Sequence, residues 1–406
     1  MIQVHRNAPL RICLVAPYDL SVRGGGVKHH VFGLAHALRA RGDSVTILGP
    51  ASRPVLEPGV VSTGGIVSIE SNGSANEMAL FSSPFETLEF FRSRPFDVIH
   101  IHEPSIPALA YWATWLTPGV PKLCTFHAFA DSPPWLLRIG QKAFGALLYP
   151  FFARGLAVSG AAAEYASRAW TRPLSIVPNG VDTQLFTPPV SARATGSVRL
   201  LFVGRLGDAR KGWNVLLGAY RTLLANGANV SLDVVGDTSG VAALPDLPGL
   251  RFHGPVSLLE LVAQYRACDI FVAPSLSQES FGIVLLEAMS AGRAIVCSDI
   301  RGYREVAKPG GAAFVRPADP EALAATITSL ALDTTRRVAM QDFNRAAVES
   351  YGWPALAECV REHYLDVVAS HSHRGAQRAI ESTGALVTSP SKRLASTNPA
   401  SNTGIV

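Results

Sequence analysis

Residues 269–299 read DIFVAPSLSQESFGIVLLEAMSAGRAIVCSD. The stretch opens with a short apolar run at 269–275, passes through a polar loop, and enters a helical pattern that begins near Gly282. It closes with a second apolar run at 294–299. Short apolar runs on either side of a helix predict two buried strands joined by a crossover, and such a crossover connects parallel strands. The stretch therefore predicts an α/β fold with a parallel sheet.

The same alternation extends from this stretch toward the N-terminus. Three more strands of this series are predicted at 198–204, 230–236 and 250–255. An earlier series is predicted upstream, at 11–16, 44–49, 97–102, 122–127, 155–160 and 175–180, with intervening helices that include 27–39, 108–117 and 139–152. The two series are separated by TPPVSARATGS at 187–197, whose Pro, Ser and Gly content is typical of a linker.

These patterns predict two Rossmann-like domains with doubly wound parallel sheets, one over 1–186 and the other over 198–350. We expect the two domains to face a cleft, because ligands of such sheets bind at the carboxyl ends of the strands. The segment 370–406 is rich in Ser, Thr, Ala, Gly and Asn and shows no apolar periodicity. We therefore predict a disordered tail there.

Composition excludes several classes of protein. The net charge is +5, but much of this surplus lies after residue 371, in the tail, so the rest of the chain offers no basic footprint for nucleic acid. The five cysteines are far apart and form no CxxC pattern of a zinc or redox site. No signal-peptide layout is present, and the longest apolar region, 143–163, is interrupted by Pro150 and Arg154. We expect a cytoplasmic protein, with peripheral contact with the inner membrane face as an open alternative.

Candidate binding residues follow two predicted strands of the second domain. Arg205, Arg210 and Lys211 lie in the loop VGRLGDARKG (203–212), where cations suit a diphosphate leaving group. The alternative interpretation is that these cations form an ordinary solvent-exposed basic surface without a ligand.

The loop after 269–275 leads into a helix whose first amides, at Gly282 to Val284, favour a phosphate. Glu287 lies about one and a half turns into that helix and is placed to bind a ribose. In the alternative interpretation Glu279 caps the helix and Glu287 forms a surface ion pair, but the apolar neighbours of Glu287 disfavour a solvated position.

The first domain offers weaker candidates. Glycines at 24–26 lie between a predicted strand and helix, where backbone amides can approach a phosphate or sugar, or simply form a tight turn. His127 ends a predicted strand and is able to bond a sugar hydroxyl or a phosphate, although a lone histidine is more often structural. His100 and His102 alternate on one strand face, and no HExxH spacing for zinc is present.

Seven motifs together resemble the retaining glycosyltransferases of family GT4, which have the GT-B fold, and most closely the bacterial phosphatidylinositol mannosyltransferases. The resemblance covers roughly residues 10–368. Its carriers are GGVKHHV (25–31), FDVIHIHEP (96–104), TFHAF (125–129), AVSGAA (157–162), IVPNGVD (176–182), FVGRLGDARKG (202–212) and ESFGIVLLEAMSAG (279–292). The last contains Glu279 and Glu287 separated by seven residues, which matches the family's E-x7-E motif.

The resemblance implies a role for each candidate residue. Arg205 and Lys211 would hold the diphosphate of the donor, Glu287 its ribose, and Glu279 the hydroxyls of the transferred sugar. The other implied positions are His127 near the reacting centre, Gly25 and Gly26 near the sugar and the acceptor, and the donor-lining residues Phe281, Gly282, Ile283 and Val284. Family members retain anomeric configuration without a metal, and their last helix, here around 353–368, packs back on the first domain.

The resemblance thus implies an enzyme that needs no cofactor and uses GDP-mannose or a UDP-sugar as its donor substrate. Its acceptor would be a lipid headgroup, such as phosphatidylinositol, or a glycan. Two alternatives stay open: a catalytically inactive nucleotide-sugar-binding partner protein and a GT-B sugar-nucleotide epimerase. Region 68–96 is interpreted as an amphipathic helix that covers the sheet, with lipid contact through its aromatic residues as the alternative.

Overall fold

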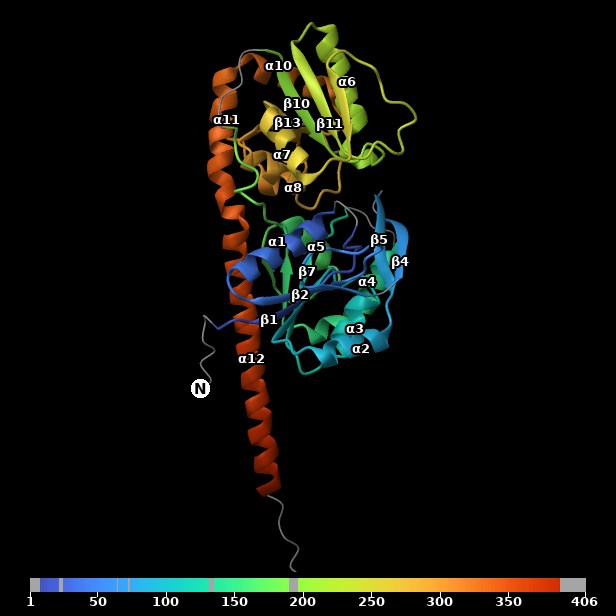
Figure 1. The fold of residues 1–406 in the computed structure, drawn as a ribbon, viewed down its shortest axis with the longest axis vertical. Coiled ribbons are helices and arrows are strands. Elements are labelled where there is room, and N and C mark those ends of the chain that lie inside the picture. Colours follow the sequence, from blue (N-terminus) through green and yellow to red (C-terminus); the bar gives the residue numbers. More distant parts are fainter. Residues whose placement is uncertain are drawn as a thin grey trace, which may run out of the picture.

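The computed structural model describes residues 8–21, 25–63, 65–71, 74–130, 135–189 and 196–387 (Figure 1). Most of the predicted linker, at 190–195, and the end of the predicted tail, at 388–406, lie outside the described residues. So does the first glycine of the triplet, Gly24.

The first domain contains a seven-stranded parallel sheet with the order β3-β2-β1-β6-β7-β8-β9. Its strands are β1 (Arg11–Val15), β2 (Ser44–Gly49), β3 (Val60–Ser62), β6 (Val98–His102), β7 (Lys122–Phe126), β8 (Arg154–Ala157) and β9 (Leu174–Ile176). The helices are α1 (Gly26–Ala40), α2 (Pro84–Ser93), α3 (Leu109–Trp115), α4 (Trp135–Leu148) and α5 (Gly160–Ala166), with a 3-10 turn η1 (Tyr149–Phe151). Outside region 68–96, the strands and helices predicted for this domain are confirmed within a few residues, and the short β3 is an additional strand of this sheet.

Side-chain alternation along the strands divides this domain's core into two layers. Ile12 and Leu14 of β1 belong to the apolar cluster that contains α1, whereas Cys13 and Val15 belong to the cluster that contains α3 and α5. Successive side chains of a strand point to opposite faces, so a strand that is buried on both faces reads as the continuous apolar run seen in the sequence.

Region 68–96 differs from its predicted single helix. A two-stranded antiparallel hairpin, β4 (Gly65–Ser71) and β5 (Ser74–Phe81), precedes α2, which begins only at Pro84. Asn-Gly stands between the two strands in the sequence, and this dipeptide is a strong hairpin signal that outweighs a helical reading of the aromatic spacing. The N-cap Ser83 accepts a hydrogen bond from the Glu86 amide and Pro84 starts the helix, so α2 has a defined N-terminus.

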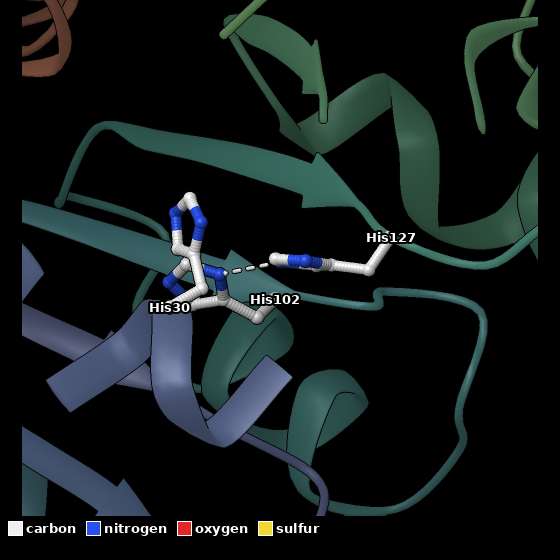
Figure 2. Close-up of side chains that lie close together, drawn as sticks. All are labelled: His30, His102 and His127. Atoms are coloured by element: carbon white, nitrogen blue, oxygen red, sulfur yellow. Dashed lines mark hydrogen bonds between the residues drawn. The ribbon is translucent and has the colours of Figure 1, made fainter. Parts of the chain in front are cut away.

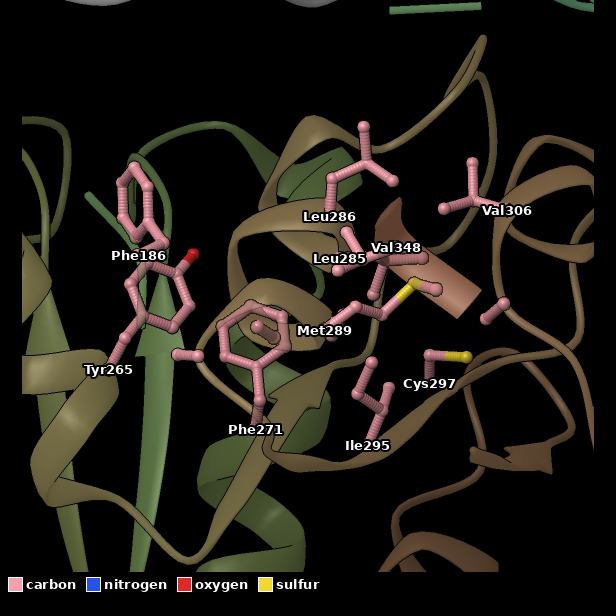
Figure 3. Close-up of a cluster of buried hydrophobic side chains, with 14 of the residues drawn as sticks. Phe186, Tyr265, Phe271, Leu285, Leu286, Met289, Ile295, Cys297, Val306 and Val348 are labelled. Carbon is pink, nitrogen blue, oxygen red and sulfur yellow. The ribbon is translucent and has the colours of Figure 1, made fainter. Parts of the chain in front are cut away.

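The second domain repeats the architecture with a six-stranded parallel sheet in the order β12-β11-β10-β13-β14-β15. Its strands are β10 (Val198–Val203), β11 (Val230–Val235), β12 (Leu250–Gly254), β13 (Ile270–Ala273), β14 (Ala294–Ser298) and β15 (Ala312–Val315). The helices are α6 (Trp213–Ala225), α7 (Leu258–Ala267), α8 (Ile283–Ser290), α9 (Arg301–Val306), α10 (Pro320–Leu332) and α11 (Thr334–Ala347), with 3-10 turns η2 (Ala209–Lys211) and η3 (Val348–Tyr351). One face of the sheet packs on α7 and α8, and their apolar contacts are drawn in Figure 3. Every strand predicted here is present, and β15 is an additional one.

The C-terminal helix α12 (Trp353–Val387) returns to the first domain and runs along α1 (Figure 1). Trp353, Val360 and Tyr364 join the apolar cluster of α1, and the buried Arg361 pairs with the buried Asp43 at 3.0 Å. The predicted disordered tail is wrong over its first part, because α12 continues without a break to Val387. The residues beyond 370 include many good helix formers, such as Ala, Arg, Gln and Glu, which extend an existing helix without an apolar stripe.

Candidate active site

The cation loop after β10 is held in one conformation against the end of β13. Gly212 adopts the left-handed region with φ 71, and a Cβ there would lie 1.9 Å from the carbonyl oxygen of Pro274. The amide of Leu276 donates to the carbonyl of Arg210 at 2.7 Å, which joins the two loops again. Because β10 and β13 are neighbouring parallel strands, both loops emerge at the same edge of the sheet.

This packing brings Lys211 and Glu279 together. The Lys211 Nζ donates to Glu279 Oε1 at 2.6 Å, and both side chains are largely buried, with 23% and 14% of their surface exposed. The two residues come from different loops and were predicted to contact different parts of a donor. The ion pair shows that the two sites are adjacent, so a single ligand can meet both side chains.

Asp208 organises the other two cations of the loop. Its carboxylate pairs with Arg210 at 2.6 Å and lies 3.6 Å from a guanidinium nitrogen of Arg205. It also caps η2 by accepting from the Arg210 amide. Asp208 thus offsets part of the positive charge of the loop, whereas the Arg205 side chain stays 47% exposed.

The N-terminus of α8 lies beside the Lys211–Glu279 pair. Gly282 is its N-cap, with φ 94, and a Cβ there would lie 2.7 Å from the Tyr303 ring, so a glycine is required. Phe281 is buried under the turn, and Ile283 and Val284 form the first turn of the helix. The first amides of a helix lack intrahelical partners and carry partial positive charge, so binding of an anion at this turn stays a prediction that the geometry permits.

Glu287 lies deeper in the same helix, between the buried residues Leu286 and Ala288. Its side chain is buried, and it accepts a hydrogen bond from the hydroxyl of Tyr265 in α7 at 2.7 Å. Burial raises the pKa of Glu287 to about 7, and the Tyr265 hydrogen bond offsets only part of that rise. The alternative of a surface ion pair, which the apolar neighbours already disfavoured, finds no support among the contacts described for Glu287, and burial favours the protonated form of its carboxyl group.

The two domains meet at residues predicted for the donor site. A Cβ on Gly26, in the first turn of α1, would lie 3.4 Å from Ile283 Cδ1 at the start of α8. Gly25, the N-cap of α1, has φ 99. Glu305 of α9 reaches across and accepts from the amides of Gly160 and Ala161 at 2.6 and 2.8 Å, at the N-terminus of α5. The carboxylate complements the positive end of α5, so this contact holds the domains together.

His127 belongs to a buried group of histidines on the first-domain side (Figure 2). Its Nε2 lies 3.0 Å from Nδ1 of His102, and the ring of His30 packs edge-on against it with centroids 4.9 Å apart. One ring nitrogen of each residue lies within 4.8 Å of the others, a spacing that could hold a metal ion. Burial lowers the pKa of His30 to about 4 and lowers the pKa values of His102 and His127 well below their usual range, so the rings are neutral at physiological pH.

Glu103 positions His127 and was not among the predicted site residues. Its carboxylate accepts from the backbone amides of His127 and of Ala128, the latter at 2.8 Å. Glu103 itself is buried and has a positive φ of 49, and burial raises its pKa. Glu103 lies in the motif FDVIHIHEP, so the motif could have identified it as a candidate site residue. Its hydrogen-bond partners follow the neighbouring strand β7 and could not be predicted from the motif.

The structure thus forms two groups of predicted residues. The donor-side group comes from the second domain and comprises Arg205, Lys211, Glu279, Phe281, Gly282, Ile283, Val284 and Glu287. The first-domain group comprises Gly25, Gly26 and His127, and Gly26 is the member whose described contacts reach the donor-side group. Besides Glu103, sequence reasoning missed Tyr265 and Glu305, whose roles become apparent only through contacts with residues distant in the sequence.

Comparison with known proteins gives consistent matches. Residues 24–185 match the family profile described as Glycosyltransferase Family 4, and residues 197–333 match the profile described as Glycosyl transferases group 1. A phosphatidyl-myo-inositol mannosyltransferase of Mycobacterium leprae is 33% identical over 89% of this chain and 98% of its own.

Solved structures agree in fold. A sucrose-phosphate synthase of Thermosynechococcus elongatus superposes with a TM-score of 0.70 at 20% identity, covering 89% of this chain and 100% of that one. The Anabaena protein HepE, in complex with UDP-glucose, gives a TM-score of 0.67 at 18% identity, with coverage of 89% and 100%. In the described part of this chain, no helix combines the length and apolar character needed to cross a membrane.

Proposed function

Because this chain belongs to glycosyltransferase family 4 and has the GT-B fold, we propose that it is a retaining hexosyltransferase that uses a nucleotide diphosphate-sugar. Mannose is the favoured sugar, and the acceptor is a lipid headgroup, with phosphatidylinositol first, or a glycan. The observation that carries the proposal is the Lys211–Glu279 pair, 2.6 Å apart, beside the N-terminus of α8. A cation, a carboxylate and free helix amides together match a diphosphate joined to a hydroxylated sugar.

The proposed chemistry depends on stabilising the leaving group. As the bond between the sugar and the diphosphate breaks, negative charge grows on the diphosphate, and Lys211, Arg205 and the α8 amides lie where they can hold it. Lys211 exchanges its contact with Glu279 for the diphosphate, which frees the Glu279 carboxylate to accept from sugar hydroxyls. These fixed positive groups supply the electrostatic role that a divalent cation has in other transferases, so we propose metal-independent transfer.

Retention of the anomeric configuration is proposed from the resemblance to the retaining enzymes of this family. Glu279 is assigned to the sugar hydroxyls, and Glu287 is buried against Tyr265, so the proposal uses neither carboxylate as a nucleophile. We assign Glu287 to the ribose and propose that the acceptor attacks the same face that the diphosphate leaves. Positioning of the two substrates between the domains supplies the remaining rate enhancement. His127 lies on the first-domain side and is proposed to contact the transferred sugar.

A peripheral membrane position for the acceptor side is supported by α4. Trp135, Ile139 and Leu147 on this helix are exposed by 68%, 57% and 58%, and the helix also carries Arg138 and Lys142 but no acidic residue. Exposed aromatic and aliphatic side chains interleaved with cations are typical of helices that lie in the interface of an anionic membrane. Phosphatidylinositol lies in such membranes.

The decisive experiment incubates purified full-length protein with GDP-mannose or UDP-glucose and vesicles that contain phosphatidylinositol, without added metal. We expect a new glycolipid with unchanged anomeric configuration. Formation of no product, with nucleotide binding retained, would favour the inactive binding protein, and an altered free sugar nucleotide would favour the epimerase. A thermal-shift screen with GDP, UDP and ADP identifies the base, since a ligand of the native state raises the unfolding temperature.

Membrane contact is tested separately by vesicle sedimentation. We expect the double substitution Trp135→Gln and Leu147→Gln to reduce binding to vesicles that contain phosphatidylinositol at least fivefold. The matched control is Leu332→Gln on α10, because Leu332 is 84% exposed but belongs to the second domain. Equal loss in both variants, or no loss in either, would contradict the assignment of α4.

A further inference from the structure

Three histidines from three separate elements converge beneath the start of α1. His30 lies in α1, His102 ends β6, and His127 follows β7 (Figure 2). One ring nitrogen of each lies within 4.8 Å of the others, and the three residues are only 2%, 0% and 6% exposed. The neighbouring parallel strands β6 and β7 bring two of the rings together, and α1 packs across them with the third.

Hydrogen bonds around the group orient its nitrogens as ligands. The Nδ1 of His30 lies 2.9 Å from Oδ1 of the buried Asn179. Assigned as an amide oxygen, Oδ1 accepts a hydrogen bond, so Nδ1 carries the hydrogen and Nε2 keeps its lone pair. In metal sites, a ligand histidine commonly donates a hydrogen bond from the N–H of its other ring nitrogen to a carbonyl group. This outer partner fixes the orientation of the ring.

The pair formed by His102 and His127 already has a spacing close to that of two metal ligands. Their Nδ1 and Nε2 atoms are 3.0 Å apart, whereas two nitrogens bound to tetrahedral zinc at about 2.0–2.1 Å are separated by about 3.3 Å. The second nitrogen of His102, Nε2, is buried without a hydrogen-bond partner in the described structure. The ligand atom of His102 in this arrangement is therefore Nδ1, and its Nε2 carries the proton.

The position of His127 is set by Glu103 rather than by the other histidines. Glu103 accepts from the backbone amides of His127 and Ala128, so its carboxylate is occupied at the base of the loop. The three ligand atoms are consequently all imidazole nitrogens. Imidazole ligands suit Zn²⁺, Co²⁺, Ni²⁺ and Cu²⁺, whereas Mg²⁺ and Ca²⁺ require oxygen ligands.

We propose that His30, His102 and His127 form a binding site for one divalent metal ion of the zinc class, with a fourth coordination position open to water or an anion. An ion there joins α1 to the carboxyl ends of β6 and β7. The site is separate from the Lys211–Glu279 pair of the second domain, but it shares His127 with the sugar contact proposed above, so its test measures metal binding rather than sugar transfer.

The test uses untagged full-length protein freed of metal by a chelator. Isothermal titration with Zn²⁺ at neutral pH should give one ion per chain, and Mg²⁺ should give none. Titration with Co²⁺ should produce the intense visible absorption of four-coordinate cobalt. Absence of zinc binding to the wild-type protein, or only the weak absorption of six-coordinate cobalt, would overturn the proposal.

Variants locate the ion. We expect His102→Gln to lower the zinc affinity at least tenfold, and Asn179→Ala to weaken it by a smaller factor because it releases the ring of His30. The matched control His36→Gln removes an exposed histidine of the same helix as His30 and should bind zinc as wild type does. Unchanged affinity in folded His102→Gln would place the ion elsewhere and refute the site. If that variant fails to fold, the wild-type cobalt spectrum decides.

Discussion

Replacing Glu287 by glutamine should stabilise the protein while weakening its binding of nucleotide. The carboxyl group is 7% exposed, and its one described hydrogen-bond partner is Tyr265 at 2.7 Å. Its pKa is raised from 4.5 to about 7, so the folded state favours the protonated form. The stabilising contribution is complete below pH 4.5 and is lost as the pH rises through about 7, because the folded protein must then hold a buried charge.

The magnitude follows from the size of this shift. A shift of one pKa unit corresponds to about 1.4 kcal/mol, so the rise from 4.5 to about 7 amounts to about 3 kcal/mol at most. The glutamine variant keeps an oxygen to accept from Tyr265 but cannot ionise. We therefore expect the variant and the wild type to have similar free energies of unfolding at pH 5, and the variant to be more stable by up to about 3 kcal/mol at pH 8.

Nucleotide affinity should change in the opposite direction. Each hydrogen bond between the carboxylate and a ribose hydroxyl contributes about 1.5–3 kcal/mol. Its loss therefore predicts a dissociation constant that is about 10- to 150-fold larger at pH 8. Urea unfolding at pH 5, 6, 7 and 8 and nucleotide titration measure the two effects. Glu89→Gln on α2 is the matched control, because Glu89 is exposed in the first domain. Equal stability of wild type and Glu287→Gln at every pH, together with equal affinity, would refute the reasoning.

Three further substitutions test the donor loop, the domain contact and the C-terminal helix. Lys211→Ala should lower turnover by about two orders of magnitude without loss of fold, whereas Lys308→Ala, at an exposed position of the same domain, should leave turnover near that of wild type; steady-state kinetics and circular dichroism check both. Glu305→Ala removes two amide contacts across the domains, so faster hydrogen exchange at the start of α5 is expected, and unchanged exchange would count against the contact. Arg361→Ala leaves the buried Asp43 carboxylate without its ion-pair partner and should cost about 3–5 kcal/mol in urea unfolding; a loss below about 1 kcal/mol would show that the pair contributes little.

Prediction from the sequence succeeded wherever the signal was periodic and local. The mostly apolar runs at 230–236 and 294–299 became β11 and β14, because strands buried on both faces are mostly apolar, and the buried Asp233 of β11 is held by an ion pair with Arg199. It failed in region 68–96 and in the segment after 370. The hairpin β4–β5 follows a turn signal that the aromatic spacing obscured, and α12 continues by propensity rather than by an apolar stripe.

The sequence by itself determined the two parallel sheets, the loop 203–212 and the α8 N-terminus, because each depends on neighbours within a few residues along the chain. The tertiary structure alone decided which of these groups meet. Lys211 joins Glu279 only because β10 and β13 are adjacent, and His30 joins His102 and His127 only because α1 packs over β6 and β7. The domain contact of Glu305 likewise depends on packing between residues more than a hundred positions apart. Distances between side chains so far apart in sequence are set by how layers pack, and no local pattern encodes them.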